Sequence, residues 1–160
     1  MSYRICFVCM GNICRSPMAE VVMRSMVRDA GLEDQIELSS AGTGGWHVGD
    51  HADERARATL ARRGYDAESH RARQFAAHWF DENDLVLAVD ESTYSMLQSL
   101  DSEQAAEKLR LLREFDPMAD GDLDVPDPYY GGQRGFDNVL DMVERSCRGL
   151  LEHVRTQVLA

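Results

Sequence analysis

Short apolar segments alternate along this chain with longer segments in which apolar residues recur every three or four positions. Four short segments have the length and composition of buried strands, at 4–8, 36–40, 85–89 and 109–112. The helical spacing covers 17–30, 52–64, 75–80, 92–100 and 136–158. Strands that alternate with helices predict a parallel sheet covered on both faces, so we expect a three-layer α/β/α fold with a four-stranded parallel sheet.

A loop joins the first predicted strand to the first predicted helix. It reads Cys-Met-Gly-Asn-Ile-Cys-Arg-Ser-Pro over residues 9–17. Ser16 suits the N-cap of the helix, and Pro17 suits its first turn, where the missing N–H costs nothing. In open parallel sheets ligands bind beyond the carboxyl ends of the strands. Cys9 ends the first strand, where such a site is expected.

The residues of this loop have the chemistry of an oxyanion site. Backbone N–H groups at a helix N-terminus concentrate positive potential. Gly11 and Asn12 tolerate backbone conformations that other residues avoid, and Arg15 can hold two phosphoryl oxygens through its planar guanidinium. We expect the same potential to favour the thiolate form of Cys9. On its own, Cys9 is better explained as a small apolar residue at the end of a buried strand.

Composition and charge narrow the class of protein. A chain of 160 residues predicts one domain, residues 1–160, and we expect a monomer. The net charge of −11 argues against nonspecific binding to nucleic acid, and no apolar run is long enough to cross a membrane. Four cysteines do not make a disulfide framework, and the N-terminus lacks the order of a secretory signal. We therefore expect a cytoplasmic protein.

The whole loop sequence, residues 9–17, closely resembles the signature of the low-molecular-weight protein tyrosine phosphatases. The resemblance implies a flavodoxin-like or Rossmann-like topology and hydrolysis of phosphotyrosine in proteins and of aryl phosphates. It implies that Cys9 forms a phosphocysteine, that Arg15 binds phosphate, and that neither a metal nor an organic cofactor takes part. The other loop residues that it implies in phosphate or substrate binding are Met10, Gly11, Asn12, Ile13, Cys14 and Ser16.

A general acid is needed to protonate the departing phenolate oxygen. Asp127 stands in an Asp-Pro-Tyr-Tyr sequence, in which Pro128 stiffens the backbone and Tyr129 and Tyr130 offer flat apolar surface. By position alone Asp127 is one of several solvated acids in a loop rich in aspartate. The resemblance assigns it the roles of general acid and then general base.

The resemblance also implies roles for residues outside the two motifs. Trp46, in a glycine-rich loop, would form a wall of the substrate cleft, although an anchor in the core explains it too. Ser40 and His70 would support the phosphate-binding loop through hydrogen bonds, and Asp90 would support the site, although it also suits a helix N-cap. Cys14 would form a reversible disulfide with Cys9 on oxidation.

Other functions on the same scaffold are open. A thiol-dependent arsenate reductase relays electrons through further cysteines in mid-chain, and here none lies between Cys14 and Cys147. A protein-arginine phosphatase carries a threonine where Ile13 stands. A noncatalytic phosphate-binding module or a phosphocarrier would need the loop but not Asp127.

Overall fold

Four parallel strands form the centre of the protein. In this computed structural model the described part of the chain is residues 2–159, the side chain of Tyr130 excepted. The strands are β1 (Tyr3–Cys9), β2 (Ile36–Gly42), β3 (Leu85–Ala88) and β4 (Leu109–Leu111), in the order β2-β1-β3-β4. All three strand pairings are parallel, and Cys9 pairs with Gly42 at the carboxyl edge. This is the flavodoxin-like order, and the predicted fold class is confirmed.

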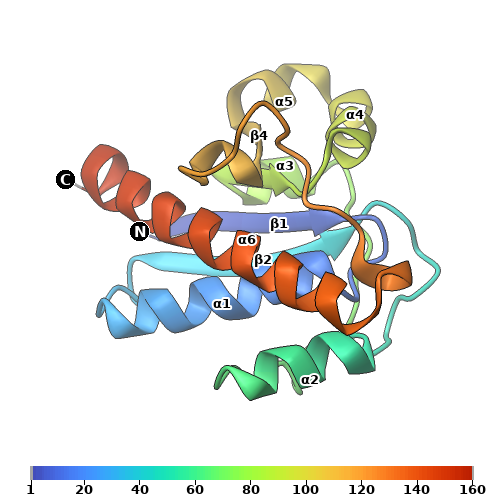
Figure 1. The fold of residues 1–160 in the computed structure, drawn as a ribbon. Helices are drawn as coiled ribbons and strands as arrows, with labels where there is room; N and C mark the ends of the chain where they lie inside the picture. The colour runs from blue at the N-terminus through green and yellow to red at the C-terminus, as the bar shows by residue number, and fades with distance from the viewer. Residues whose placement is uncertain (1, 160) are drawn as a thin grey trace.

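Two layers of helices cover the sheet (Figure 1). One layer holds α1 (Arg15–Asp29), α2 (Glu54–Arg62) and α6 (Gly132–His153), which continues as a π-helical turn, Val154–Val158. The other holds α3 (Trp79–Glu82), α4 (Glu91–Leu100) and α5 (Ser102–Lys108). Ile5 and Phe7 of β1 join the core under α1 and α6, whereas Cys6 and Val8 join the core on the opposite face. Burial of both faces explains why β1 is apolar throughout.

Several helix boundaries differ from the predicted ones. Helix α1 begins at Arg15 with Cys14 as its N-cap, and not at Pro17 with Ser16 as its cap. The predicted helix at 75–80 is wrong: α3 starts at Trp79, because the N–H of Phe75 donates to the carbonyl of Gly42 and extends the sheet edge. The sequence pattern also missed α5, which Asp101 caps through the N–H of Gln104.

The glycine predicted to end the helix at 52–64 is confirmed. Helix α2 ends next to Gly64, whose φ of 87° is the left-handed conformation expected at a helix C-terminus. Two short 3-10 turns, Leu112–Phe115 and Pro128–Tyr130, lie at the start and end of the long aspartate-rich segment. No helix within residues 2–159 combines the length and apolar character needed to span a membrane.

Candidate active site

The loop between β1 and α1, residues 9–16 and here called the phosphate loop, turns its carbonyl groups outward. The carbonyls of Cys9 and Met10 accept hydrogen bonds from the N–H groups of Thr43 and Gly44, each at 2.9 Å. The next two acceptors are the carbonyl of Asn12, bonded to His70 Nε2 at 2.7 Å, and that of Ile13, bonded to the N–H of Asp53 at 2.7 Å. Three separate segments of the chain therefore hold the loop from outside.

The same four peptide groups turn their N–H atoms inward. A trans peptide is planar, so its N–H points opposite to its C=O. The N–H groups of Met10, Gly11, Ile13 and Cys14 consequently face the interior of the loop. None of the four donates to an acceptor in the described part of the chain. Unpaired, convergent donors of this kind form a binding site for an oxyanion.

Asn12 keeps the phosphate loop in shape. Its φ of 58° is left-handed, whereas Gly11, from which the sequence led us to expect an unusual conformation, is not. The Asn12 amide donates to Ser16 Oγ at 2.8 Å and to Ser40 Oγ at 3.0 Å, and its Oδ1 accepts from the N–H of Arg73 at 2.9 Å. Asn12 and Ser16 thus form one network with Ser40 and His70, the residues predicted to support the loop.

Gly42, at the end of β2, allows the phosphate loop to pack against the sheet. A Cβ at this position would lie 2.7 Å from the carbonyl oxygen of Met10 and 3.1 Å from the amide nitrogen of Asn12. Backbone atoms cannot be moved as a flexible side chain can. A glycine is therefore required here for close approach and not for its dihedral angles.

Cys9 lies at the bottom of the site, with 3 % of its surface exposed. Its Sγ accepts from the N–H of Asn12 at 3.2 Å and lies 2.9 Å from Ser16 Oγ. Both groups can donate to a thiolate, and α1 begins close by, so its N-terminal potential acts on the same sulfur. This use of the Ser16 hydroxyl explains why Ser16 does not cap α1.

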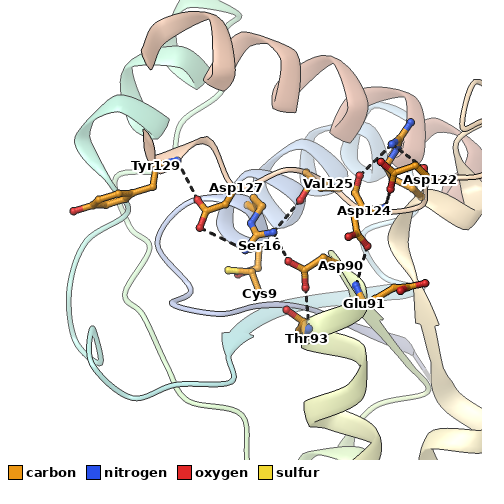
Figure 2. A network of polar contacts seen from close by, with 12 residues as sticks. Cys9, Ser16, Asp90, Glu91, Thr93, Asp122, Asp124, Val125, Asp127 and Tyr129 are labelled. Carbon is orange, nitrogen blue, oxygen red and sulfur yellow. Dashed lines mark hydrogen bonds and ion pairs between the residues drawn. The ribbon is translucent and has the colours of Figure 1, made fainter. Parts of the chain in front are cut away.

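Arg15 links the phosphate loop to two other segments. Its Nη1 donates to Asp90 Oδ2 at 2.6 Å and to the carbonyl of Val125 at 2.9 Å, and its Nη2 lies 4.0 Å from Asp127 Oδ2. Figure 2 shows these three partners, Asp90, Val125 and Asp127, near Cys9. Burial lowers the pKa of Arg15, but the charges of Cys9, Asp90 and Asp127 outweigh it and raise that pKa above its usual value. The guanidinium is therefore a permanent cation beside Cys9.

Asp90 contacts both α4 and Arg15. Its Oδ1 caps α4 by accepting from the N–H of Thr93 at 2.8 Å, while its Oδ2 holds Arg15. Burial raises the pKa of Asp90, but hydrogen bonds from Thr93 and Arg15 outweigh that effect and hold it below its usual range. Asp90 thus stays ionised and orients the guanidinium.

Asp127 approaches Cys9 from the segment that we call the acid loop, residues 122–128. Its side chain is 41 % exposed, and its Oδ1 accepts from the N–H of Tyr129 at 3.0 Å. A cavity of about 250 Å³ lies between the acid loop and the phosphate loop. The residues that line it are Cys9, Met10, Gly11, Ile13, Cys14, Arg15, His47, Asp127 and Tyr129.

Trp46 does not form the predicted wall of this cavity. Its side chain is 75 % exposed, and its ring covers Gly44, where an added Cβ would overlap it. His47 lines the cavity instead, 3.1 Å from the position that a Cβ on Gly11 would take. Among the predicted substrate-binding residues, Tyr130 has a side chain outside the described part of the structure.

Cys14 shares the cavity with Cys9, and both are free thiols. Burial raises the pKa of Cys14, and the neighbouring charges of Asp53, Cys9 and Asp127 raise it further. Cys14 therefore stays protonated near neutral pH.

Sequence reasoning missed several residues of the site. His47 could have been found from the sequence because it adjoins Trp46. Glu20, which accepts a hydrogen bond from Ser40 Oγ at 2.6 Å, could have been found because it lies one helical turn after Ser16. Gly42 lies two residues after the predicted strand at 36–40. The backbone N–H groups of Arg73 and Asp53 could not have been found from the sequence, because nearly every residue type has a backbone N–H donor.

The fold and the site together define an α/β protein that presents a cysteine inside an oxyanion-binding loop at the carboxyl end of its first strand. The chain belongs to the low molecular weight phosphotyrosine protein phosphatase family, whose sequence pattern matches residues 4–160, and the predicted class of enzyme is confirmed.

The similarity to individual relatives extends over nearly the whole chain. A low molecular weight protein-tyrosine-phosphatase of Streptomyces coelicolor is 57 % identical over 99 % of this chain and 97 % of its own length. The low molecular weight protein-tyrosine phosphatase A of Mycobacterium tuberculosis is 44 % identical over 94 % of this chain and 90 % of its own. The crystal structure of YfkJ from Bacillus subtilis superposes with a TM-score of 0.92 at 34 % identity, covering 99 % of this chain and 98 % of that one.

Proposed function

We propose that this protein hydrolyses phosphotyrosine in proteins, and aryl phosphates, through a phosphocysteine on Cys9. The observation that carries the proposal is the phosphate loop, in which four outward carbonyls leave four N–H groups converging beside the Cys9 sulfur. Arg15 at the end of the phosphate loop and the carboxyl group of Asp127 across the cavity complete the set of groups that phosphoryl transfer needs.

The first step transfers the phosphoryl group to sulfur. The Cys9 thiolate attacks phosphorus in line, so that the S–P bond forms while the bond from phosphorus to the phenolic oxygen breaks. The inward N–H groups hold the equatorial oxygens together with Nε and Nη2 of Arg15, whose Nη1 is already bonded to Asp90 and Val125. Asp127, protonated at this stage, gives its proton to the departing oxygen.

The second step hydrolyses the phosphocysteine. The Asp127 carboxylate takes a proton from water, whose oxygen attacks phosphorus as the S–P bond breaks. Phosphate is released, and Cys9 returns as a thiolate that accepts hydrogen bonds from Asn12 N–H and Ser16 Oγ. The exposed position of Asp127 supports this role, because water must reach its carboxylate.

The shape of the cavity supports an aryl substrate. Cys9 lies at its bottom and almost fully buried, while Ile13 and Tyr129 supply apolar surface along its sides. A phosphotyrosine side chain reaches such a sulfur, whereas the short side chain of phosphoserine leaves its phosphate near the mouth. We propose that the activity is cytoplasmic, because a reducing compartment keeps free thiols such as those of Cys9 and Cys14 from being oxidised to a disulfide.

The test is hydrolysis, in the presence of a chelator, of para-nitrophenyl phosphate and of peptides that carry phosphotyrosine, phosphoserine or phosphoarginine. We expect turnover of the first two substrates, abolished by Cys9→Ser and retained in Cys6→Ala, a control cysteine on the opposite face of β1. Preference for phosphoarginine would move the assignment to that activity. Phosphate binding without turnover would leave a binding module and overturn the proposal.

A further inference from the structure

A buried arginine outside the active site holds the acid loop. Arg113 lies in the 3-10 turn after β4, and its side chain is 9 % exposed. Its Nη1 donates to the carbonyl of Asp122 at 3.0 Å and to that of Asp124 at 3.1 Å. One guanidinium therefore bonds two backbone carbonyls at the start of the loop that carries Asp127.

The other contacts of this segment continue toward the active site. Asp124 Oδ1 accepts from the N–H of Glu91 at 2.9 Å, and the N–H of Val125 donates to the carbonyl of Val89 at 2.7 Å. The carbonyl of Val125 accepts from Arg15. Figure 2 shows these residues in succession, from Asp122 through Asp124 and Val125 to Asp127. The loop is thus held against the carboxyl end of β3 and the start of α4.

The short link from Val125 to Asp127 is stiff. Pro126 and Pro128 stand on either side of Asp127, and each fixes its own φ. A proline also restricts the residue before it, so Val125 and Asp127 are limited to extended conformations. Val125 is fully buried. A displacement of Val125 would therefore move the Asp127 carboxyl group, because few torsions between them could absorb it.

Arg113 has its own support in the core. Its Nε donates to Asp116 Oδ2 at 3.3 Å, and Asp116 Oδ1 accepts from Arg145 Nε at 3.1 Å. Burial raises the pKa of Asp116, but hydrogen bonds from Arg145, Met118 and Arg113 outweigh it and keep that pKa below its usual value. Apolar residues often stabilise a core as well as a buried ion pair does. The stability of the core alone therefore does not explain why residue 113 is an arginine whose Nη1 bonds the acid loop.

We propose that Arg113 is a positioning residue for Asp127: it fixes the carbonyls of Asp122 and Asp124 and so sets the acid at the distance from the leaving oxygen that proton transfer needs. The inference rests on the proposed role of Asp127 as general acid. It predicts a defect specific to leaving groups that need a proton.

The experiment measures kcat/KM of the full-length protein for two substrates, phenyl phosphate and dinitrophenyl phosphate. Phenolate is a poor leaving group that needs the acid, and dinitrophenolate departs without it. For Arg113→Met we expect kcat/KM to fall about tenfold or more with phenyl phosphate and less than about twofold with dinitrophenyl phosphate. The inhibition constant of inorganic phosphate, a competitive inhibitor, should stay within about twofold of its value in the unmodified protein, because the phosphate loop is untouched.

Arg145→Met is the matched control. It removes the other arginine that bonds Asp116. Within the described part of the chain, Arg145 does not donate to the carbonyl of Asp122 or Asp124, which Arg113 bonds. We expect it to lower the melting temperature without changing the ratio of the two rates. An equal loss with both substrates in Arg113→Met, or the same change of ratio in Arg145→Met, would overturn the proposal.

Two further variants separate the positioning role from folding and from the proposed function. Arg113→Lys keeps a charge beside Asp116, but its single ammonium group cannot hold Asp116 as Nε does and also donate to both carbonyls as Nη1 does. It carries the same test if Arg113→Met does not fold. In an Asp127→Ala background, Arg113→Met should cause no additional loss with phenyl phosphate, and an additive loss would refute positioning. If Asp127→Ala loses kcat/KM equally with phenyl phosphate and dinitrophenyl phosphate, the proposed role of Asp127 is overturned, and the proposed role of Arg113 with it.

Discussion

The phosphate loop and the acid loop meet at one cavity but are held in different ways. The phosphate loop is a continuous stretch that carries both the proposed nucleophile and the proposed anion site, and its carbonyls are bonded to three other segments. Asn12 and Ser16 within it are fully buried. The acid loop contributes one proposed reacting group, Asp127, whose side chain is partly exposed, and the anchors of the loop lie upstream at Asp122, Asp124 and Val125.

The difference follows from what each loop must do. An oxyanion site works when its donors are already oriented, so that no reorganisation is needed as charge develops. The acid must instead admit a substrate and later a water molecule, so its side chain cannot be enclosed. The four predictions below test this division of roles, beginning with the change that should have the largest effect.

Arg15→Lys should damage both loops together. A lysine cannot supply two parallel donors to phosphate while also holding Asp90 and the carbonyl of Val125. We expect kcat/KM to fall by about 10³ or more, with dinitrophenyl phosphate as much as with phenyl phosphate. Inhibition by inorganic phosphate should weaken as well. A loss confined to phenyl phosphate would mean that Arg15 acts mainly through the acid loop.

Asp127→Ala should affect only the proton-transfer role. We expect kcat/KM with phenyl phosphate to fall by roughly 10² to 10³, with a much smaller loss for dinitrophenyl phosphate and unchanged phosphate affinity. The measurement is a series of aryl phosphates whose leaving groups differ in basicity. An unchanged rate with phenyl phosphate would remove Asp127 from the mechanism.

Gly42→Ala should disturb the phosphate loop without touching a reacting group. Its Cβ would meet the Met10 carbonyl oxygen at 2.7 Å, so the loop must shift. We expect a loss of about 1–3 kcal/mol in the free energy of unfolding and weaker inhibition by phosphate. Gly135→Ala is the control: it lies in α6, where the nearest contact of a Cβ is 3.8 Å, and alanine favours a helix. Equal behaviour of the two variants would contradict the close packing at Gly42.

His70→Gln should change the pH dependence of stability. Burial lowers the pKa of His70, although its bond to the Asn12 carbonyl acts in the opposite direction. The unfolded chain then takes up a proton at a higher pH than the folded protein, so stability falls as the pH drops below about 6.5. Urea unfolding between about pH 8 and pH 5 should show a shallower fall in His70→Gln. His153, whose pKa burial also lowers, is present in both proteins and cancels in the comparison. Identical slopes would show that His70 carries no such linkage.

The amino-acid sequence by itself determined the parts of this protein that depend on neighbouring residues. The alternation of strands and helices, the placement of Cys9 after β1 and the left-handed tolerance of Asn12 all follow from local geometry and side-chain type. The motif at 9–17 and the Asp-Pro-Tyr-Tyr sequence led to the candidate nucleophile, anion ligand and acid. The resemblance of these two short, continuous motifs to those of a known family was needed there, because by position alone Cys9 and Asp127 each have a plainer explanation.

Only the tertiary structure decided how those groups are held. Ser16 was expected to cap a helix, but its hydroxyl faces Cys9 and Asn12. Residues 75–80 were expected to be helical, but the N–H of Phe75 bonds the carbonyl of Gly42. The cavity wall expected of Trp46 is formed by His47. The bonds from Arg113 to the acid loop, and from Asp53 and His70 to the phosphate loop, join segments whose pairing is set by the parallel crossovers of the sheet. Most of these bonds use backbone groups, which every residue type carries, so no pattern of side chains announces them.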